Sequence, residues 1–154
     1  MKNPARISVI GAGECDQQVY AAAKRLGQLL AEKGLEVVCG GLQGVMRAVS
    51  EGVTQSGGRT IGIVPGLDTA AANKYIQIPV ATGLGQMRNF LVVLNGDLVI
   101  AVEGGYGTLC ELALALKTGK TVIAMGRWAS IPGVVPADGP EEACALALRY
   151  LGNS

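Results

Sequence analysis

The chain has 154 residues, of which 49% are hydrophobic and 16% are charged, and its formal net charge is +1. This composition predicts one domain over residues 1–154 and excludes a disordered chain, because disorder requires low hydrophobicity and high net charge. A near-neutral chain without basic clusters is not expected to bind nucleic acid, and the lack of histidine excludes His-based catalysis and the usual mixed zinc sites.

The first half of the chain alternates apolar runs with amphipathic segments. Strands are predicted at Arg6–Ile10, Leu35–Cys39 and Thr60–Val64, since each is a short apolar run that ends at glycine or proline. Between them, a helix capped by Asp16 and a second helix over about residues 43–55 place their apolar side chains on one face. The order strand, helix, strand, helix, strand follows.

The second half opens with a looser stretch, residues 65–85, which is long for a connector. It is therefore expected to be a lid or ligand loop, with a possible short strand at Tyr75–Ile78. A helix over residues 85–95 is apolar nearly all round, which predicts burial in the core or against a second subunit. Further strands are predicted at Leu98–Val102 and Thr121–Met125, each followed later by a helix.

This repeated pattern of strand, glycine loop and helix predicts an α/β fold, a Rossmann-like doubly wound parallel sheet in a single three-layered domain. Ligands of such sheets bind at the carboxyl ends of the strands, where the strand order reverses. If the five strands lie in the order 3-2-1-4-5, the loops at Gly11 and Gly104 face each other across one crevice.

Two glycine loops in the first half are candidates for holding an anion. In the first, Gly11 and Gly13 follow a strand, but Asp16 stands where a dinucleotide fingerprint needs a small residue, which argues against NAD. In the second, Gly41 and Gly44 precede a helix whose N-terminal amides attract anions, without the Gly-Lys-Ser/Thr of a Walker loop. On pattern alone, either loop is equally explained as a tight turn without a ligand.

The third glycine loop is the most informative. Gly104, Gly105, Gly107 and Thr108 lie at a helix start and form a dense array of N–H donors. Thr108 and Glu111 have the T-x-x-E spacing of a capping box. Glu111 is therefore either a helix cap or a carboxylate of the site, and the spacing favours the cap.

Arg88 is a cation in the first turn of an apolar helix, where it opposes the helix dipole. A buried arginine there requires an anionic partner, either an acid of this chain or a ligand phosphate. The alternative is that its side chain extends to solvent.

Five blocks stand out together: Gly40–Met46, Ile61–Pro65, Met87–Asn89, Asn95–Asp97 and Gly104–Glu111. They resemble the LOG-type family of cytokinin riboside monophosphate phosphoribohydrolases, which are often mislabelled as lysine decarboxylases. The resemblance covers about residues 37–125, and the Gly-Gly-x-Gly-Thr-x-x-Glu element is its most specific part. The short length and the Arg-Asn pair look closer to a small bacterial branch, which also resembles the molybdenum-cofactor carrier proteins.

The resemblance implies that Arg88 and Glu111 are catalytic and that no cofactor or metal is needed. The residues expected to hold the substrate and its phosphate are Gly11, Gly13, Gly41, Gly44, Met87, Gly104, Gly105, Gly107 and Thr108. Two positions depart from the family: Asn89 replaces a lysine, and Glu103 places a carboxylate where proline usually opens the loop. An inward-pointing Glu103 would repel a phosphate.

Three functions remain open at this stage. The first is hydrolysis of the base–ribose bond of a nucleoside 5'-monophosphate, with Glu111 stabilising the ribosyl cation and Arg88 and the glycine loop holding the phosphate. The second is binding or carriage, without turnover, of a nucleotide or a phosphorylated cofactor such as a molybdopterin. The third is a structural oligomer whose glycine loops only pack. Retention of Arg88 and Glu111 favours the first by a small margin.

The remaining expectations concern surroundings and partners. The ligand is expected to be a small phosphorylated molecule, because glycine loops and arginine both suit phosphate. No apolar run is long enough to cross a membrane, and four cysteines without C-x-x-C spacing fit reduced thiols of a cytoplasmic protein. A chain with so few charged residues cannot make its whole surface polar. We therefore expect a homodimer or homotetramer with Phe90, Leu91 or Leu94 near the interface.

Overall fold

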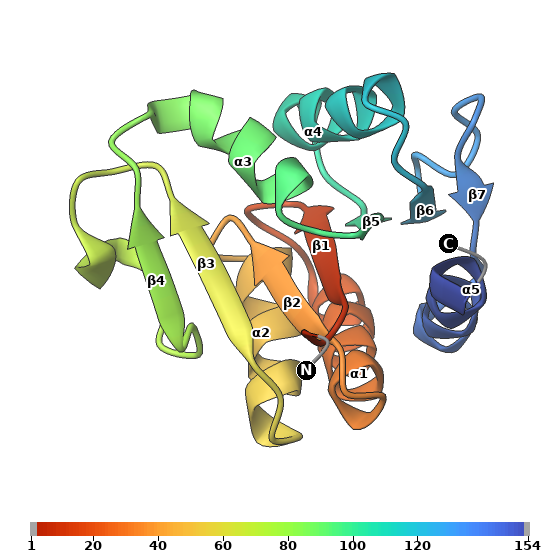
Figure 1. Cartoon of the computed structure of the whole chain (residues 1–154), viewed down its shortest axis with the longest axis horizontal. Coiled ribbons are helices and arrows are strands. Elements are labelled where there is room, and N and C mark those ends of the chain that lie inside the picture. Colours follow the sequence, from red (N-terminus) through yellow and green to blue (C-terminus); the bar gives the residue numbers. More distant parts are fainter. Residues whose placement is uncertain (1–2, 153–154) are drawn as a thin grey trace.

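A parallel sheet in the order β4-β3-β2-β1-β5-β6-β7 forms the centre of residues 3–152, the part of the chain that the computed structural model describes (Figure 1). The strands are β1 (Arg6–Gly11), β2 (Glu36–Cys39), β3 (Thr60–Val64), β4 (Ile78–Ala81), β5 (Leu98–Val102), β6 (Val122–Met125) and β7 (Val135–Pro136). The helices are α1 (Gln17–Glu32), α2 (Val45–Gln55), α3 (Arg88–Leu94), α4 (Tyr106–Lys117) and α5 (Pro140–Gly152), with 3-10 turns η1 (Thr69–Ala71) and η2 (Gly85–Met87).

The strand order confirms the doubly wound expectation. β1 lies between β2 and β5, so that Ser8 pairs with Val38 on one side and with Val99 on the other. The chain therefore reverses its direction of winding at β1, and the loops after β1 and β5 leave the sheet side by side. This is the switch point at which ligands of such sheets bind.

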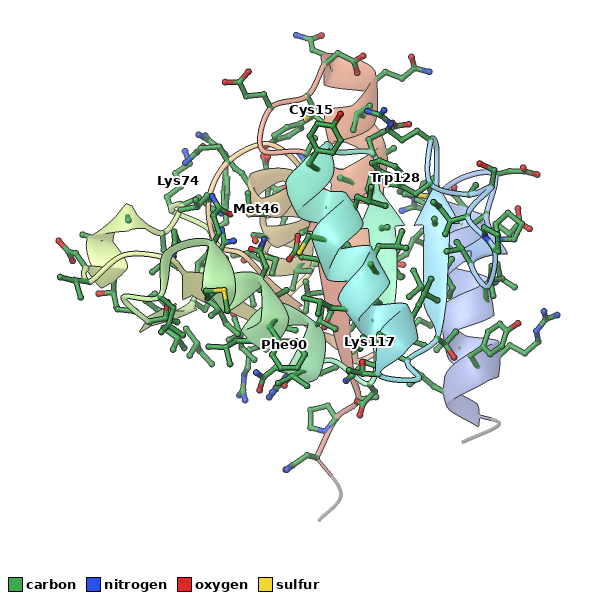
Figure 2. All side chains as sticks on the ribbon, turned by 90° about the horizontal axis from the view of Figure 1, so that it is seen from above. Cys15, Met46, Lys74, Phe90, Lys117 and Trp128 are labelled. Atoms are coloured by element: carbon green, nitrogen blue, oxygen red, sulfur yellow. The ribbon has the colours of Figure 1, made fainter. Side chains whose placement is uncertain are left out.

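Helices cover both faces of the sheet and complete the expected three layers. α1, α2 and α5 lie on one face, and α3 and α4 lie side by side on the other (Figures 1 and 2). Alternate strand residues serve the two sides: Ile7 and Val9 belong to the core under α1 and α2, whereas Ile10 belongs to the core under α3 and α4. No helix within residues 3–152 combines the length and apolar character needed to cross a membrane.

Both edge strands differ from expectation. The short strand predicted at Tyr75–Ile78 begins only at Ile78, because the carbonyl of Tyr75 accepts the hydroxyl hydrogens of Thr54 and Thr60 and the chain turns there. β7, at the other edge, is two residues long and carries no periodicity that a sequence could display.

The helix ends confirm one expected cap and overturn another. Asp16 accepts a hydrogen bond from the Val19 amide at 2.8 Å and caps α1 as predicted. The capping box expected for Thr108 and Glu111 is wrong, because α4 begins at Tyr106 with Gly105 as its cap residue. Thr108 is thus already inside the helix, and Glu111 lies a turn further on, free of any capping role.

The helix expected in the core or against a second subunit is buried on its inner side only in the single chain. Residues 85–95 form the 3-10 turn η2 followed by the seven-residue α3. Arg88, Asn89, Val92 and Val93 face inward, whereas the outer side exposes Met87, Phe90 and Leu94. The position of Phe90 on this outer layer is seen in Figure 2.

Candidate functional site

Two pockets lie next to each other at the carboxyl edge of the sheet. The smaller, which we call the Arg88 pocket, has a volume of about 290 Å³ and is lined by Val9, Ile10, Gly11, Ala12, Gly13, Gly40, Leu42, Met46, Gln86, Arg88, Asn89, Gly105, Gly107, Thr108 and Glu111. The larger, the Glu103 pocket, has a volume of about 910 Å³ and lies between the N-termini of α1 and α5. Ala12, Gly13 and Gly105 line both, so one ligand has access to the two.

Arg88 is held rigidly at the base of the smaller pocket. Its side chain is buried, with 7% of the residue exposed, so the alternative of a solvent-directed side chain is wrong. The guanidinium donates from Nε to the Ile63 carbonyl at 3.0 Å and from Nη2 to the Gly40 carbonyl at 3.4 Å. A Cβ at position 40 would lie 2.9 Å from Nη2, so glycine is needed there for the guanidinium to fit.

Glu111 lines the same pocket from α4 and is 8% exposed. Burial raises the pKa of its carboxyl to about 8, although the positive charge of Arg88 opposes the shift. Glu111 therefore keeps its proton at neutral pH. The pocket then carries the single positive charge of Arg88, since the other lining side chains are neutral.

The N-terminus of α4 forms another wall of the Arg88 pocket. Gly105, Gly107 and Thr108 line it there, and the first amides of a helix have no partner within the helix. α4 is twelve residues long, so these amides also carry the positive end of its dipole. This wall supplies neutral donors that are directed toward an anion.

The structure gathers seven of the eleven expected site residues in the Arg88 pocket and leaves four outside it. The seven are Gly11, Gly13, Arg88, Gly105, Gly107, Thr108 and Glu111. Gly41 packs against β3, where a Cβ would lie 2.8 Å from Val64, and a Cβ on Gly44 would strike the Ala12 carbonyl at 2.3 Å. Met87 is 73% exposed on the outer side of η2, and Gly104 lines the Glu103 pocket instead.

Sequence reasoning missed several residues of the pocket, of which Asn89 is the most telling. Its Oδ1 accepts a hydrogen bond from Arg88 Nη1, and only 6% of the residue is exposed. The sequence presents the Arg-Asn pair as the loss of a cation, but the adjacent positions at the start of a helix also place a second polar group near Arg88. Gln86, Leu42 and Met46 also line the pocket, and no motif marks them.

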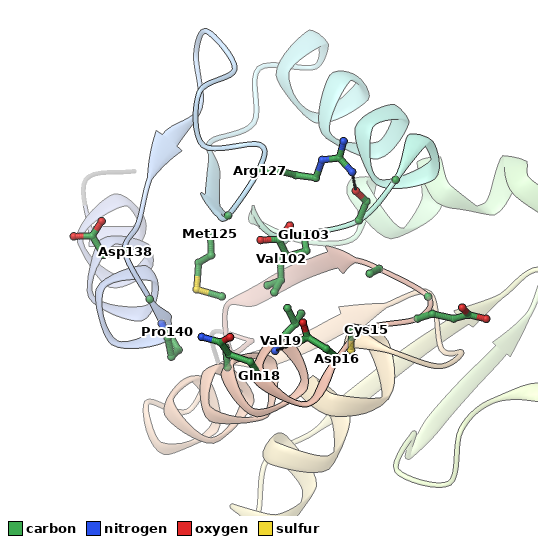
Figure 3. A pocket seen from close by; sticks show the side chains of 18 residues that line it. Cys15, Asp16, Gln18, Val19, Val102, Glu103, Met125, Arg127, Asp138 and Pro140 are labelled. Carbon is green, nitrogen blue, oxygen red and sulfur yellow. Dashed lines mark hydrogen bonds between the residues drawn. The ribbon is translucent and has the colours of Figure 1, made fainter.

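Glu103 points away from the Arg88 pocket. Its backbone has φ 50°, in the left-handed region, and its carbonyl accepts a hydrogen bond from Trp128 Nε1 at 3.1 Å. The carboxylate lies over Gly126, where a Cβ would be 1.8 Å from Oε1, and enters the Glu103 pocket beside Met125 (Figure 3). Glu103 is therefore not among the lining residues of the smaller pocket, and the expected repulsion of a phosphate is avoided by geometry.

The Glu103 pocket is acidic and open. Glu14, Asp16, Glu103 and Asp138 line it, and Arg127 is its one basic residue. Arg127 is engaged with the protein, because it donates to the Gly104 carbonyl at 3.2 Å (Figure 3) and its guanidinium lies over the Trp128 ring. Within residues 3–152 no group of three or more acidic or cysteine side chains has the geometry of a metal site.

Residues 4–144 match the SLOG cluster4 family over their whole length. The chain belongs to the SLOG cluster4 family. An uncharacterised protein of Archaeoglobus fulgidus is 44% identical to this SLOG cluster4 protein over 138 residues, which cover 90% of the chain and 91% of the relative. A cytokinin riboside 5'-monophosphate phosphoribohydrolase of Arabidopsis thaliana is 33% identical over 106 residues. That match covers 66% of the SLOG cluster4 chain and 46% of the plant enzyme, so the chain spans less than half the length of this relative.

Solved structures resemble this SLOG cluster4 protein over its full length. The molybdenum cofactor binding protein of Rippkaea orientalis superimposes with a TM-score of 0.91 at 36% identity and covers 98% of this chain and 99% of its own. The molybdenum cofactor carrier protein of Chlamydomonas reinhardtii gives a TM-score of 0.89 at 30% identity, with 97% and 99% covered. The resemblance to LOG-type proteins and to cofactor carriers is thus confirmed for this SLOG cluster4 chain, together with the Rossmann-like fold.

Proposed function

We propose that this protein binds a phosphorylated small molecule, with the phosphate in the Arg88 pocket and the rest of the ligand in the Glu103 pocket. The observation that carries the proposal is the pairing of a buried, fixed Arg88 with an uncharged Glu111 beside the first amides of α4. A buried cation requires an anion, and the described residues that line the pocket supply none at neutral pH because Glu111 keeps its proton. A phosphate is the anion that fits both a guanidinium and a helix N-terminus.

The size of the neighbouring Glu103 pocket supports carriage of a ligand, rather than its hydrolysis, as the first candidate function. The Arg88 pocket, at about 290 Å³, accommodates a phosphate and a sugar-sized group, while the Glu103 pocket offers about 910 Å³ for a larger heterocycle. The full-length likeness to proteins named for molybdenum cofactor binding supports the same reading. We infer that the ligand is a phosphorylated cofactor of the molybdopterin kind, which the protein binds and releases unchanged.

A second candidate is the hydrolysis of a nucleoside 5'-monophosphate, and the proton on Glu111 favours it. A carboxylic acid with a pKa of about 8 is able to donate its proton to the leaving base as the base–ribose bond breaks. The resulting carboxylate would stabilise the ribosyl cation, and a water molecule would add its oxygen to the ribose carbon and return a proton to Glu111. Arg88 and the α4 amides would hold the phosphate throughout.

One experiment separates the two candidates. The purified protein is titrated by calorimetry with AMP, GMP and a phosphorylated pterin, and each mixture is then analysed by chromatography for released base. Carriage predicts binding of a phosphorylated ligand and quantitative recovery of it. Hydrolysis predicts free base and ribose 5-phosphate in equal amounts. If no phosphorylated ligand binds above the level of its unphosphorylated counterpart, the proposed function is wrong.

A further inference from the structure

The side-chain amide of Asn89 has a fixed orientation. Arginine carries only donors, so the atom of Asn89 that faces Arg88 Nη1 is the oxygen, Oδ1. The amide nitrogen Nδ2 is then the other branch of the amide, and it lies near the N-terminus of α4. A Cβ at Gly107, the second residue of α4, would lie 4.0 Å from Nδ2.

The two N–H donors of Nδ2 have no acceptor among residues 3–152. The contact of Asn89 with Arg88 is its one side-chain hydrogen bond in that part of the chain. Every side-chain nitrogen or oxygen there that is sealed from solvent has a partner, so the unpaired Nδ2 reaches the surface of the Arg88 pocket, which Asn89 lines. Asn89 is only 6% exposed, and the opening to the pocket leaves its free donor to water or to a ligand.

We propose that Asn89 is a ligand-binding residue, whose Nδ2 donates to an anionic oxygen of the ligand held between it and the first amides of α4. This inference rests on the proposed function and adds to it a residue that donates a hydrogen bond to the phosphate. The same side chain orients Arg88 through Oδ1, so the Asn89 amide connects the Arg88 guanidinium with the neutral N–H donors at the start of α4. Because Asn89 is uncharged, it adds a contact to the phosphate without adding a second buried cation next to Arg88.

Two substitutions separate the contact with the ligand from the contact with Arg88. Asn89→Asp keeps an oxygen for Arg88 and removes the N–H donors, at the expense of a new negative charge. Asn89→Leu removes both roles and adds no charge. Asn3→Asp, at an exposed position remote from both pockets, is the matched control for the added charge.

Binding is measured by calorimetry with inorganic phosphate and with ribose 5-phosphate, beside a thermal melt of each variant. Loss of a donor to a charged oxygen is expected to weaken binding of both probes by roughly 10- to 100-fold in Asn89→Asp and in Asn89→Leu. Asn3→Asp should bind as the wild type does. Asn89→Asp should melt close to the wild-type temperature, because its carboxylate still partners Arg88. The side-chain amide signals of Asn89, identified by their loss in Asn89→Asp, should shift in a nitrogen–proton correlation spectrum when phosphate is added.

Each result has one meaning. If Asn89→Leu binds both probes as tightly as the wild type, the inference is overturned, and any loss in Asn89→Asp is then due to charge repulsion alone. Unshifted Asn89 amide signals at saturating phosphate would overturn it as well. If the wild type itself binds neither probe, the proposed function fails and the role of Asn89 fails with it. If the wild type binds the probes and both variants bind them equally well, only the inference about Asn89 is wrong and the proposed function stands.

Discussion

The Arg88 pocket and the Glu103 pocket share Ala12, Gly13 and Gly105, but they differ in how their charges are held. In the first, Arg88 is tied to two backbone carbonyls and to Asn89, and Glu111 is neutral at neutral pH because it is buried. In the second, the carboxylates lie at helix ends and loops around an open volume. On the proposed function, the phosphate would be recognised by fixed, desolvated groups, whereas the rest of the ligand would meet groups that remain hydrated.

The largest expected effect is on phosphate binding when the fixed cation is removed. Arg88→Met should weaken binding of ribose 5-phosphate by about 100-fold or more, because a buried cation–phosphate contact is lost. The matched change in the other pocket is Arg127→Met, which removes a cation that is engaged with the Gly104 carbonyl and Trp128. We expect less than about a threefold effect there. Calorimetry on both variants measures the difference, and equal losses would refute the assignment of the phosphate to the Arg88 pocket.

The next effect is a pH dependence of stability that belongs to Glu111. Its pKa is about 8 in the folded protein and 4.5 ordinarily, so folding takes up a proton between these values. Over that range the free energy of unfolding of the wild type should fall as pH rises, by up to about 1.4 kcal/mol per pH unit, and level off above pH 8. Glu111→Gln lacks this ionisable group. Urea denaturation should therefore show its free energy of unfolding increasing relative to that of the wild type as the pH rises to 8.

The same variant tests the role of Glu111 in turnover. If the protein hydrolyses nucleotides, Glu111→Gln should reduce base release by roughly 100- to 1000-fold while ribose 5-phosphate still binds. Stability and turnover are measured on one sample. Unchanged turnover with an unchanged melt would make Glu111 a spectator and refute its catalytic assignment.

A smaller effect concerns oligomerisation through α3, the helix that contributes Arg88 and Asn89 to the Arg88 pocket. Such an interface would leave the Glu103 pocket uncovered. α3 turns Arg88 and Asn89 inward and exposes Phe90 and Leu94 outward, with Leu94 45% exposed. We expect a homodimer or homotetramer through this side, and Leu94→Glu should weaken its association by at least about tenfold. Leu148→Glu, at an exposed leucine of α5, is the control. A monomeric wild type in light scattering at micromolar concentration would contradict the expectation.

The smallest effect is in the Glu103 pocket and concerns the backbone. Glu103 has φ 50°, a conformation that glycine adopts without strain. Glu103→Gly should therefore raise the free energy of unfolding by roughly 0.5–1 kcal/mol, or the melting temperature by about 1–4 °C. Glu103→Ala loses the carboxylate but keeps the strain, and should show no gain. A higher melting temperature in both variants would trace the effect to the charge and not to the backbone.

The fold was largely predictable because its signals are local. Short apolar runs bounded by glycine or proline predicted β1, β2, β3, β5 and β6, and the repeated strand–helix pattern predicted the doubly wound sheet, whose strand order was only assumed. The edge strands were misplaced or missed, since β4 is displaced by the side-chain hydrogen bonds to Tyr75 and β7 has only two residues.

The site was predictable in part, because motifs identify residue types but not their directions. The third glycine loop, Arg88 and Glu111 do meet in one pocket. The cap assigned to Thr108 failed because the helix begins two residues earlier, at Tyr106. The direction of Glu103 depends on Gly126 and Trp128, which lie more than twenty positions further along the chain, and no local pattern encodes such a contact.

The position of β1 in the middle of the sheet also constrains the order in which the molecule is built. β1 pairs with β2 after one short crossover, but its other neighbour is β5, and the paired residues Ile7 and Leu98 are separated by about 90 residues of chain. Closing so long a loop is slow relative to forming the local units before it. The walls contributed by α3 and α4 join the loop after β1 only when this pair closes. A ligand of the Arg88 pocket is therefore expected to bind only after β1 and β5 have paired, and its binding would stabilise the chain in that state.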